Sequence, residues 1–221
     1  MKMLGLLLLG THRLGRMNTS RLRDACLPRK YVGMQTAHKY FREKDFPSWD
    51  IYSPRPLSPN DKDSGFSAEH VYPRSLLVPN EDAKKDIHNL FFTRLFINRH
   101  RNNYRFSETI TASNSIKMVG DDSSDGRLHF DESLYNYKDS QQKTFVPIRS
   151  ARGPIARSIA YMGLIYPELD IQDIIDLKLL KEWNKVYPPD NREITRNKKI
   201  RSIQYNENPF ILVPKLVDTH F

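Results

Sequence analysis

Prolines divide the C-terminal third of the chain into segments of helix length. One run opens at Pro154 and ends at Pro167, the next ends at Pro188, and a third ends before Pro209. Proline breaks the interior of a helix but is tolerated in its first turn. We therefore expect a helix that starts at about Pro154 and two more that follow it, so that residues 153–210 form a helical part.

Apolar residues recur at helical spacing within these segments. Stripes of this kind pack into a protein core far more often than they bind a cofactor. The residues that we assign to the core are Ile155, Ile159, Met162, Leu179, Leu180, Trp183, Tyr187, Ile200 and Ile203. At the start of the last segment, Asp190 followed by Glu193 resembles a capping box.

The middle of the chain alternates short strand-like and helix-like patterns. We predict a short strand within residues 66–77, a second one over 86–92 and a helix over 93–101. Gly, Asp and Ser dominate residues 119–126, which predicts a turn. Residues 31–64 read as irregular structure that packs through its aromatic side chains.

Length and composition limit the class of protein. A chain of 221 residues with 38% hydrophobic content can bury one core, and we predict a single α+β domain, mostly helical, over residues 31–221. The longest apolar run, residues 3–9, is shorter than the roughly 20 residues that cross a bilayer. Cys26 is the single cysteine, so no intramolecular disulfide can form. We expect a soluble monomer without a membrane-spanning segment.

The net charge of +9 favours a polyanionic partner such as nucleic acid. Residues 1–30 contain seven basic residues and one acidic residue, and therefore hold six of the nine charges. We interpret them as a basic leader, which resembles either a short signal peptide or an organelle transit peptide, or else as an uncleaved extension, so the localisation stays open. Basic residues also cluster at 94–105 and 178–201, where a solvated helix face would explain them as well.

Two polar clusters contain side chains suited to metal binding or proton transfer. One is Glu69-His70, and the other combines Asp86-Ile87-His88-Asn89-Leu90 with residues 97–103. An imidazole can accept a proton from water near neutral pH, and carboxylate and amide oxygens suit Mg²⁺ or Ca²⁺. A zinc site built from His70, His88 and His100 lacks cysteine ligands and the usual spacing. The sequence has neither a Gly-x-Ser-x-Gly elbow nor a glycine-rich phosphate loop.

In their order, these motifs resemble the endonuclease I family, bacterial secreted and periplasmic nucleases of the His-Me finger (ββα-metal) superfamily. The resemblance covers roughly residues 50–218. The matching segments are Glu69-His70-Val71-x-Pro73-x-Ser75, Asp86-x-His88-Asn89-Leu90, Asn98-x-x-Arg101-x-Asn103, Gly153-Pro154-Ile155-Ala156-Arg157 with Tyr161-Met162, Glu182-Trp183, Glu193-x-x-Arg196-Asn197, Gln204 and Asn208-Pro209-Phe210.

The resemblance implies a ββα-metal finger at about residues 66–105 and a role for each of its polar residues. His70 would be the general base that activates water, while Glu69 and Asn98 would hold one Mg²⁺, with Ca²⁺ or Mn²⁺ as substitutes. His88, Asn89 and Asn103 would support the finger, although ordinary structural hydrogen bonding would also account for them. The substrate would be DNA, and RNA as well, bound through its phosphates and cut to 5′-phosphate and 3′-hydroxyl ends.

The sequence departs from the family pattern at three points. Family members usually place a phosphate-clamping arginine between the two histidine motifs, where only Arg74, Lys84 and Lys85 are available here. Arg74 is our candidate for this contact, with Arg101 as a substitute. The family's Phe-Glu-Pro reads Phe-Val-Pro at residues 145–147, and one cysteine cannot form the disulfides frequent in secreted relatives.

Two other functions fit the same fold. One is a nucleic-acid-binding protein that has lost catalysis, and the other is a sequence-specific nuclease of the same superfamily. A two-metal nuclease fits less well, because it needs several bridging carboxylates and only Glu69 stands beside the expected base.

Overall fold

The structure is a computed structural model that describes residues 13–32, 49–53, 65–78, 80–110, 115–119 and 135–221, the segment 115–119 by its backbone alone. The helices are α2 (Thr19–Cys26), α4 (Glu81–Lys85), α5 (Leu95–Arg101), α6 (Arg149–Ile165), α7 (Leu177–Val186), α8 (Asn191–Gln204), α9 (Pro209–Leu212) and α10 (Leu216–His220). The strands are β1 (Phe66–His70), β2 (Leu90–Arg94), β3 (Arg105–Phe106), β4 (Ser115–Val119), β5 (Tyr135–Asp139) and β6 (Thr144–Val146). Short 3₁₀ turns lie at Arg74–Leu76, Ile87–Asn89 and Ile171–Asp173.

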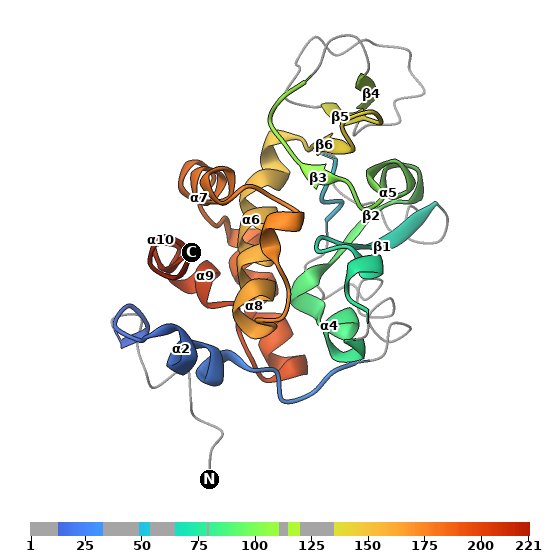
Figure 1. Cartoon of the computed structure of the whole chain (residues 1–221). Helices are drawn as coiled ribbons and strands as arrows, with labels where there is room; N and C mark the ends of the chain where they lie inside the picture. Colours follow the sequence, from blue (N-terminus) through green and yellow to red (C-terminus); the bar gives the residue numbers. More distant parts are fainter. Residues whose placement is uncertain (1–12, 33–48, 54–64, 79, 111–114, 120–134) are drawn as a thin grey trace.

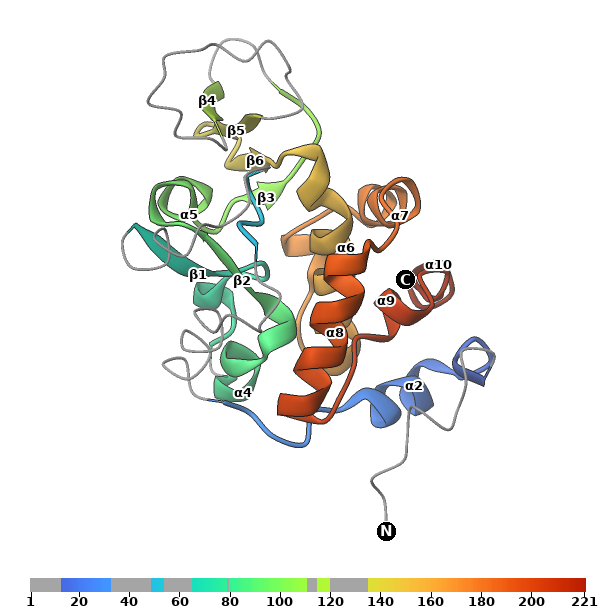
Figure 2. The ribbon, with the colours of Figure 1, turned by 180° about the vertical axis from the view of Figure 1, so that it is seen from behind.

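The strands form two small sheets. β1 pairs with β2 in an antiparallel ladder, whereas the second sheet has the order β3-β6-β5-β4 with a parallel β3–β6 pair. In both views α6 and α8 run side by side through the middle of the molecule (Figures 1 and 2). The β1–β2 sheet, α4 and α5 lie on one side of this pair, and α7, α9 and α10 lie on the other. The fold is therefore α+β, with helices as its larger part, as predicted.

The apolar stripes predicted for the C-terminal helices are core residues. Ile155, Ile159 and Met162 of α6 are fully buried, and Leu180 and Trp183 of α7 pack in the same cluster. Ile200 and Ile203 of α8 instead meet Ile87, Leu90 and Phe92 in a second cluster beneath β2. The prediction that these stripes form the core is confirmed, and their packing joins the helices to the strands that carry the polar motifs.

The prediction that α6 begins at Pro154 is wrong. The helix starts five residues earlier, at Arg149, so Pro154 lies in its second turn and cannot donate to the Ser150 carbonyl. Burial outweighs this loss, because Ala151, Gly153 and Ile155 are all covered by neighbouring elements. A Cβ at Gly153 would overlap the Tyr187 carbonyl oxygen, so the absence of a side chain lets the end of α7 approach this turn.

Other element boundaries differ by a few residues. The second strand begins at Leu90 rather than Asp86, because the Asp86 side chain accepts from the His88 amide and turns Ile87–Asn89 into a 3₁₀ helix. The helix predicted over 93–101 starts at Leu95. Of the predicted capping box, the Asp190 carboxylate does accept from the Glu193 amide, but the Glu193 side chain binds Arg157 instead.

Residues 13–32, which the sequence places mostly in the leader, pack against the domain. Leu22 and Cys26 on α2 are fully buried in the main core, and Leu14 is nearly so. The Asn206 side chain donates to the Cys26 carbonyl, and the Arg29 amide donates to the Gln204 carbonyl. This part of the expected leader is thus tied to the end of α8.

Some predictions fall outside the described residues. These are the turn expected over 119–126, except for Val119, and most of the irregular segment 31–64, of which Trp49 and Tyr52 are buried as expected for aromatic packing. Within the described ranges, none of the helices combines the length and the apolar character that crossing a membrane requires.

Candidate active site

The first sheet and α5 bring the predicted site residues together. Glu69 and His70 end strand β1, where they lie opposite Phe91 and Leu90 of β2. α5 begins directly after β2, and its first amide, that of Leu95, donates to the Gly65 carbonyl at the start of β1. The strand–strand–helix order therefore places one face of α5 alongside β1.

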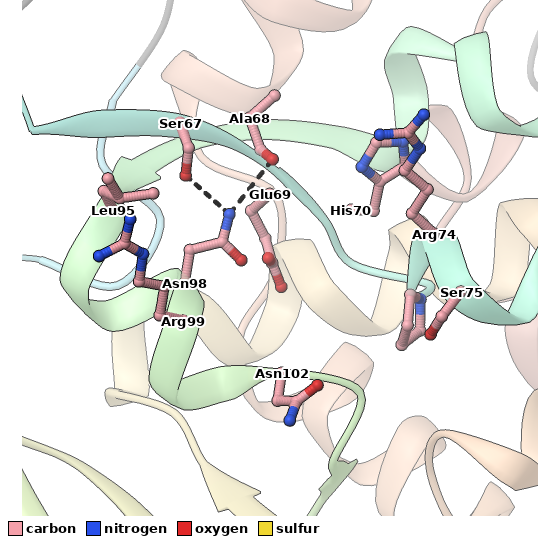
Figure 3. A pocket seen from close by; sticks show the side chains of 11 residues that line it. Ser67, Ala68, Glu69, His70, Arg74, Ser75, Leu95, Asn98, Arg99 and Asn102 are labelled. Atoms are coloured by element: carbon pink, nitrogen blue, oxygen red, sulfur yellow. Dashed lines mark hydrogen bonds between the residues drawn. The ribbon is translucent and has the colours of Figure 1, made fainter.

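A pocket of about 440 Å³ opens between β1, the following 3₁₀ turn and α5. Glu69, His70 and Asn98 all line it, although His70 and Asn98 lie 28 positions apart in the sequence. Figure 3 shows Glu69 between Asn98 and His70, with Arg74 beside the histidine. The remaining lining residues are Ser67, Ala68, Pro73, Ser75, Leu95, Arg99 and Asn102.

Glu69 is almost fully buried behind this pocket. The Tyr52 hydroxyl donates to Oε1 at 2.8 Å, and the Arg101 Nε lies 3.1 Å from the same oxygen. Burial raises the pKa of Glu69 to about 7, while Arg101 and the Tyr52 hydroxyl act in the opposite direction by favouring the carboxylate. Among the described residues, the contacts of this carboxylate all fall on Oε1, which leaves Oε2 as the oxygen available to the pocket.

His70 is oriented by a backbone carbonyl. Its Nε2 lies 3.0 Å from the carbonyl oxygen of Lys84, at the end of α4, and the residue is 8% exposed. Because a carbonyl oxygen can only accept, Nε2 must carry the proton in this contact. In the neutral imidazole the basic lone pair is then on Nδ1.

Asn98 is oriented in a similar way. Its Nδ2 donates to the Ser67 hydroxyl at 2.7 Å and to the Ala68 carbonyl at 3.3 Å (Figure 3). The carbonyl contact identifies the amide nitrogen, so Oδ1 points away from β1. The side chain thus offers its oxygen to the pocket that Glu69 also lines.

The arginines near the site have different surroundings. Arg74 is exposed and lines the pocket, as a phosphate contact requires. Arg101 is fully buried, with its guanidinium against Glu69, the Val71 carbonyl and the ring of Phe106, and it is absent from the pocket lining. Arg101 therefore has no exposed guanidinium for the phosphate contact that was its alternative role.

Arg99 lines the pocket and was missing from the candidates drawn from the sequence. It lies one residue after Asn98 and one turn after Leu95, which also faces the pocket. Helical spacing of three to four residues places these side chains on one face of α5. That periodicity could have predicted Arg99 as a pocket residue, whereas the family motif contains Arg101.

The three residues expected to support the finger do not behave alike. Asn89 is buried and makes a two-way contact with Tyr72, accepting from its amide at 2.7 Å and donating to its carbonyl at 3.0 Å. His88 is buried against the ring of Tyr161. Asn103 is exposed, and its side chain makes no hydrogen bond with the residues that the structure describes, so nothing supports its bracing role. Asn89 and Arg101 make such contacts instead.

Residues of the C-terminal motifs form hydrogen bonds with the segment 86–90 and hold it in place. Arg196 of α8 donates to the carbonyls of Ile87 and Leu90, and the Gln204 side chain accepts from the Ile87 amide. The Asp86 carboxylate accepts from Tyr161, Tyr166 and Gln204. These residues are buried and lie outside the pocket lining, so their contribution is to the shape of the site.

The donor set is small. Within the described ranges, no group of three or more His, Cys, Asp or Glu side chains converges as a metal cluster. This argues against the zinc arrangement of His70, His88 and His100, since His88 is buried against Tyr161 and His100 packs against Phe96. One carboxylate and one amide oxygen at a pocket instead resemble the sparse protein ligation of Mg²⁺, which keeps most of its waters.

Comparison with known proteins agrees with this geometry. The chain matches the family model described as Endonuclease I over residues 33–215. It is 30% identical over 192 residues to a periplasmic deoxyribonuclease of Aeromonas hydrophila, an alignment that covers 78% of this chain and 74% of that protein. An extracellular deoxyribonuclease of the same organism is 28% identical over 192 residues, covering 78% and 76% of the two chains.

A more distant relative carries a different name. An extracellular ribonuclease of Bacillus subtilis (strain 168) is 27% identical over 171 residues, which cover 69% of this chain and 53% of that protein. The family match spans the pocket residues and the C-terminal motifs that support them. The chain therefore belongs to the endonuclease I family, and it is an endonuclease.

Proposed function

We propose that this protein is a metal-dependent endonuclease with little sequence preference, which hydrolyses phosphodiester bonds of DNA and also of RNA. His70 acts as the general base, and Glu69 with Asn98 holds a single Mg²⁺. The strand–strand–helix unit of β1, β2 and α5 is then the ββα-metal finger of the His-Me superfamily. The observation that carries the proposal is that Glu69, His70 and Asn98 line one pocket.

The orientation of His70 supports its role as the base. With Nε2 donating to the Lys84 carbonyl, Nδ1 is the atom that takes the proton from water. The oxygen of that water attacks phosphorus, the bond from phosphorus to the 3′ oxygen breaks, and another water supplies the proton that the 3′ oxygen needs. The products carry a 5′-phosphate and a 3′-hydroxyl.

The oxygens of Glu69 and Asn98 fit a hard divalent cation. The Glu69 contacts fall on Oε1 and the Asn98 amide nitrogen is occupied at β1, so one carboxylate oxygen and one amide oxygen remain for the ion. When bound, Mg²⁺ would supply stabilisation of the negative charge that grows on the phosphate and the departing oxygen. Mn²⁺ or Ca²⁺ would compete for the same oxygens.

Low sequence preference follows from the kind of side chains at the pocket. Arg74 and Arg99 line the pocket. In the proposed complex their guanidinium groups contact phosphates, which are common to every sequence and to both DNA and RNA. The relatives include proteins named deoxyribonucleases and ribonucleases, which favours activity on both polymers.

A nicking assay on supercoiled plasmid tests the proposal. We expect cleavage in Mg²⁺ and none with a chelator, and a loss of about 100-fold or more in rate for His70→Ala. His100→Ala is the matched control, because this histidine lies outside the pocket lining. Full activity of His70→Ala would refute the assignment of the base. Tight DNA retention without cleavage in any divalent metal would point to a binding protein, and discrete fragments to a sequence-specific enzyme.

A further inference from the structure

Two side chains outside the pocket lining contact the same carboxylate oxygen of Glu69. Tyr52 and Arg101 are both fully buried, and both contact Oε1. Resting on the proposed function, we propose that Tyr52 and Arg101 are positioning residues, which fix the Glu69 carboxylate so that Oε2 is presented to the divalent cation.

The asymmetry of these contacts, together with the place of Glu69 at the pocket, is the main observation. Two other buried carboxylates, Glu193 and Asp86, are satisfied on both oxygens, whereas Asp50 has its hydrogen bonds on Oδ1 but lies outside the pocket lining. Glu193 receives Arg157 Nε on Oε1 and Nη2 on Oε2, at 2.7 and 2.6 Å. Asp86 accepts from His88 and Gln204 on one oxygen and from two tyrosines on the other. Glu69 combines both features: its contacts with the described residues fall on Oε1, and it lines a pocket, as a carboxylate held for an incoming ligand does.

Tyr52 lies outside any helix or strand, but its backbone and its ring are both held by contacts with other segments. Its amide donates to the Asp50 carboxylate at 3.0 Å, and its carbonyl accepts from the Asn136 side chain at 2.9 Å. Its ring packs edge-on against Phe145, with centroids 5.1 Å apart. These contacts leave the phenol little freedom, so the position of its hydroxyl fixes the position of Oε1.

Arg101 approaches the same oxygen from α5. Its guanidinium is held by the Val71 and Asn102 carbonyls and lies over the ring of Phe106, 4.5 Å from the centroid. It is therefore rigid as well as charged. A hydrogen bond from Tyr52 and an ion pair with Arg101, from separate segments, restrain the rotation of the carboxylate, which a single contact would leave open. Partners of this kind, one step removed from a metal, are known to change metal affinity by about 10- to 100-fold.

Calorimetric titration of the substrate-free protein with Mn²⁺ tests the role of Tyr52. We expect Tyr52→Phe to raise the dissociation constant about 10-fold or more, and the Mg²⁺ concentration for half-maximal cleavage to rise in parallel. At saturating Mg²⁺ the cleavage rate should approach that of the wild type. Tyr72→Phe is the matched control, since this buried hydroxyl donates to the Asp170 carbonyl, away from Glu69.

The outcomes separate the two proposals. If the wild type binds the ion and cleaves DNA while Tyr52→Phe keeps its metal affinity within twofold, the positioning role is overturned and the proposed function stands. If the wild type neither binds a divalent ion nor cleaves, the proposed function itself fails. Loss of folding in Tyr52→Phe would also count against positioning, because the hydroxyl would then serve the fold. Arg101→Lys repeats the titration with the charge retained and the fixed Nε contact removed, and an unchanged constant would exclude Arg101.

Discussion

Arg157 and Glu193 form a two-pronged ion pair that joins the two central helices. Nε and Nη2 of Arg157 on α6 donate to the two carboxylate oxygens of Glu193 on α8, and both side chains are buried. A third nitrogen, Nη1, donates to the Tyr187 carbonyl at the end of α7. One guanidinium thus links α6 to α8 and to the C-terminal end of α7.

Breaking this pair should destabilise the protein strongly. Glu193→Ala leaves the Arg157 charge buried without its carboxylate, and we expect a loss of about 3–5 kcal/mol in the free energy of unfolding. Replacing both residues, as Arg157→Met with Glu193→Leu, should recover much of that loss. Urea unfolding followed by tryptophan fluorescence measures both. Arg192→Ala, which breaks the exposed Arg192–Asp190 pair, should cost no more than about 1 kcal/mol. An equally small effect for Glu193→Ala would contradict the argument.

The sequence predicted the parts of this fold that depend on local patterns. Prolines and apolar spacing located the C-terminal helices, and the order of the polar motifs brought Glu69, His70 and Asn98 to one pocket. Two things escaped prediction. Tyr52 lies in an irregular segment whose contact with Glu69 depends on the tertiary fold. The charge of Arg101 does not tell whether a guanidinium faces a phosphate or a buried acid.

The start of α6 shows the same limit. Pro154 predicts a helix start by local rules, yet tertiary packing of residues 151–155 extends the helix by a turn before it. In the N-terminal segment, the arginines suggest a leader, while Leu22 and Cys26, four residues apart, are the buried face of a helix. The charge of the arginines indicated a leader, but the spacing of Leu22 and Cys26 corresponds to a helix that packs into the core.

Arg74 and Arg99 should govern the salt dependence of cleavage. Each arginine that contacts a phosphate releases counterions from the nucleic acid. Its removal should therefore make the negative slope of log(kcat/KM) against log[salt] less steep by about one. Arg74→Ala and Arg99→Ala are therefore expected to weaken cleavage of all sequences alike, most clearly at low salt. Lys185→Ala, an exposed charge on α7 outside the pocket lining, controls for net charge. Slopes equal to that of the wild type would show that neither arginine contacts the substrate phosphates.

His88 should make the fold sensitive to acid. Burial and the nearby Arg196 charge lower the pKa of His88 to about 3, so the His88 imidazole is neutral in the folded protein. The stabilisation is complete above the unfolded pKa, near 6.5, and is lost as the pH falls towards 3, by about 1.4 kcal/mol per pH unit. Urea unfolding at pH 6.5 and pH 5 should show this loss in the wild type.

His88→Phe isolates that contribution, since phenylalanine keeps a ring against Tyr161 and cannot be protonated. Burial raises the pKa of Asp50 to about 6 and also raises that of Asp86, so these acids stabilise the fold as the pH falls. Both proteins retain them, and the difference between the two pH profiles therefore reports on His88. Parallel profiles would show that the imidazole is not buried in its neutral form.

The N-terminal helix α2 should be required for a stable fold. Leu22 is fully buried in the main core, so Leu22→Ala should cost about 2–5 kcal/mol of unfolding free energy through lost burial and a cavity. Leu27→Ala, one residue past α2 where the side chain is 38% exposed, should change it far less. A chain that starts at residue 13 keeps all the described N-terminal residues and serves as the reference. One that starts at residue 33, where the family match begins, should lose most of its stability. Equal melting temperatures for the two truncated chains would mean that residues 13–32 only rest on the surface. A lower melting temperature for the chain that starts at residue 33 would show that residues 13–32 stabilise the folded domain.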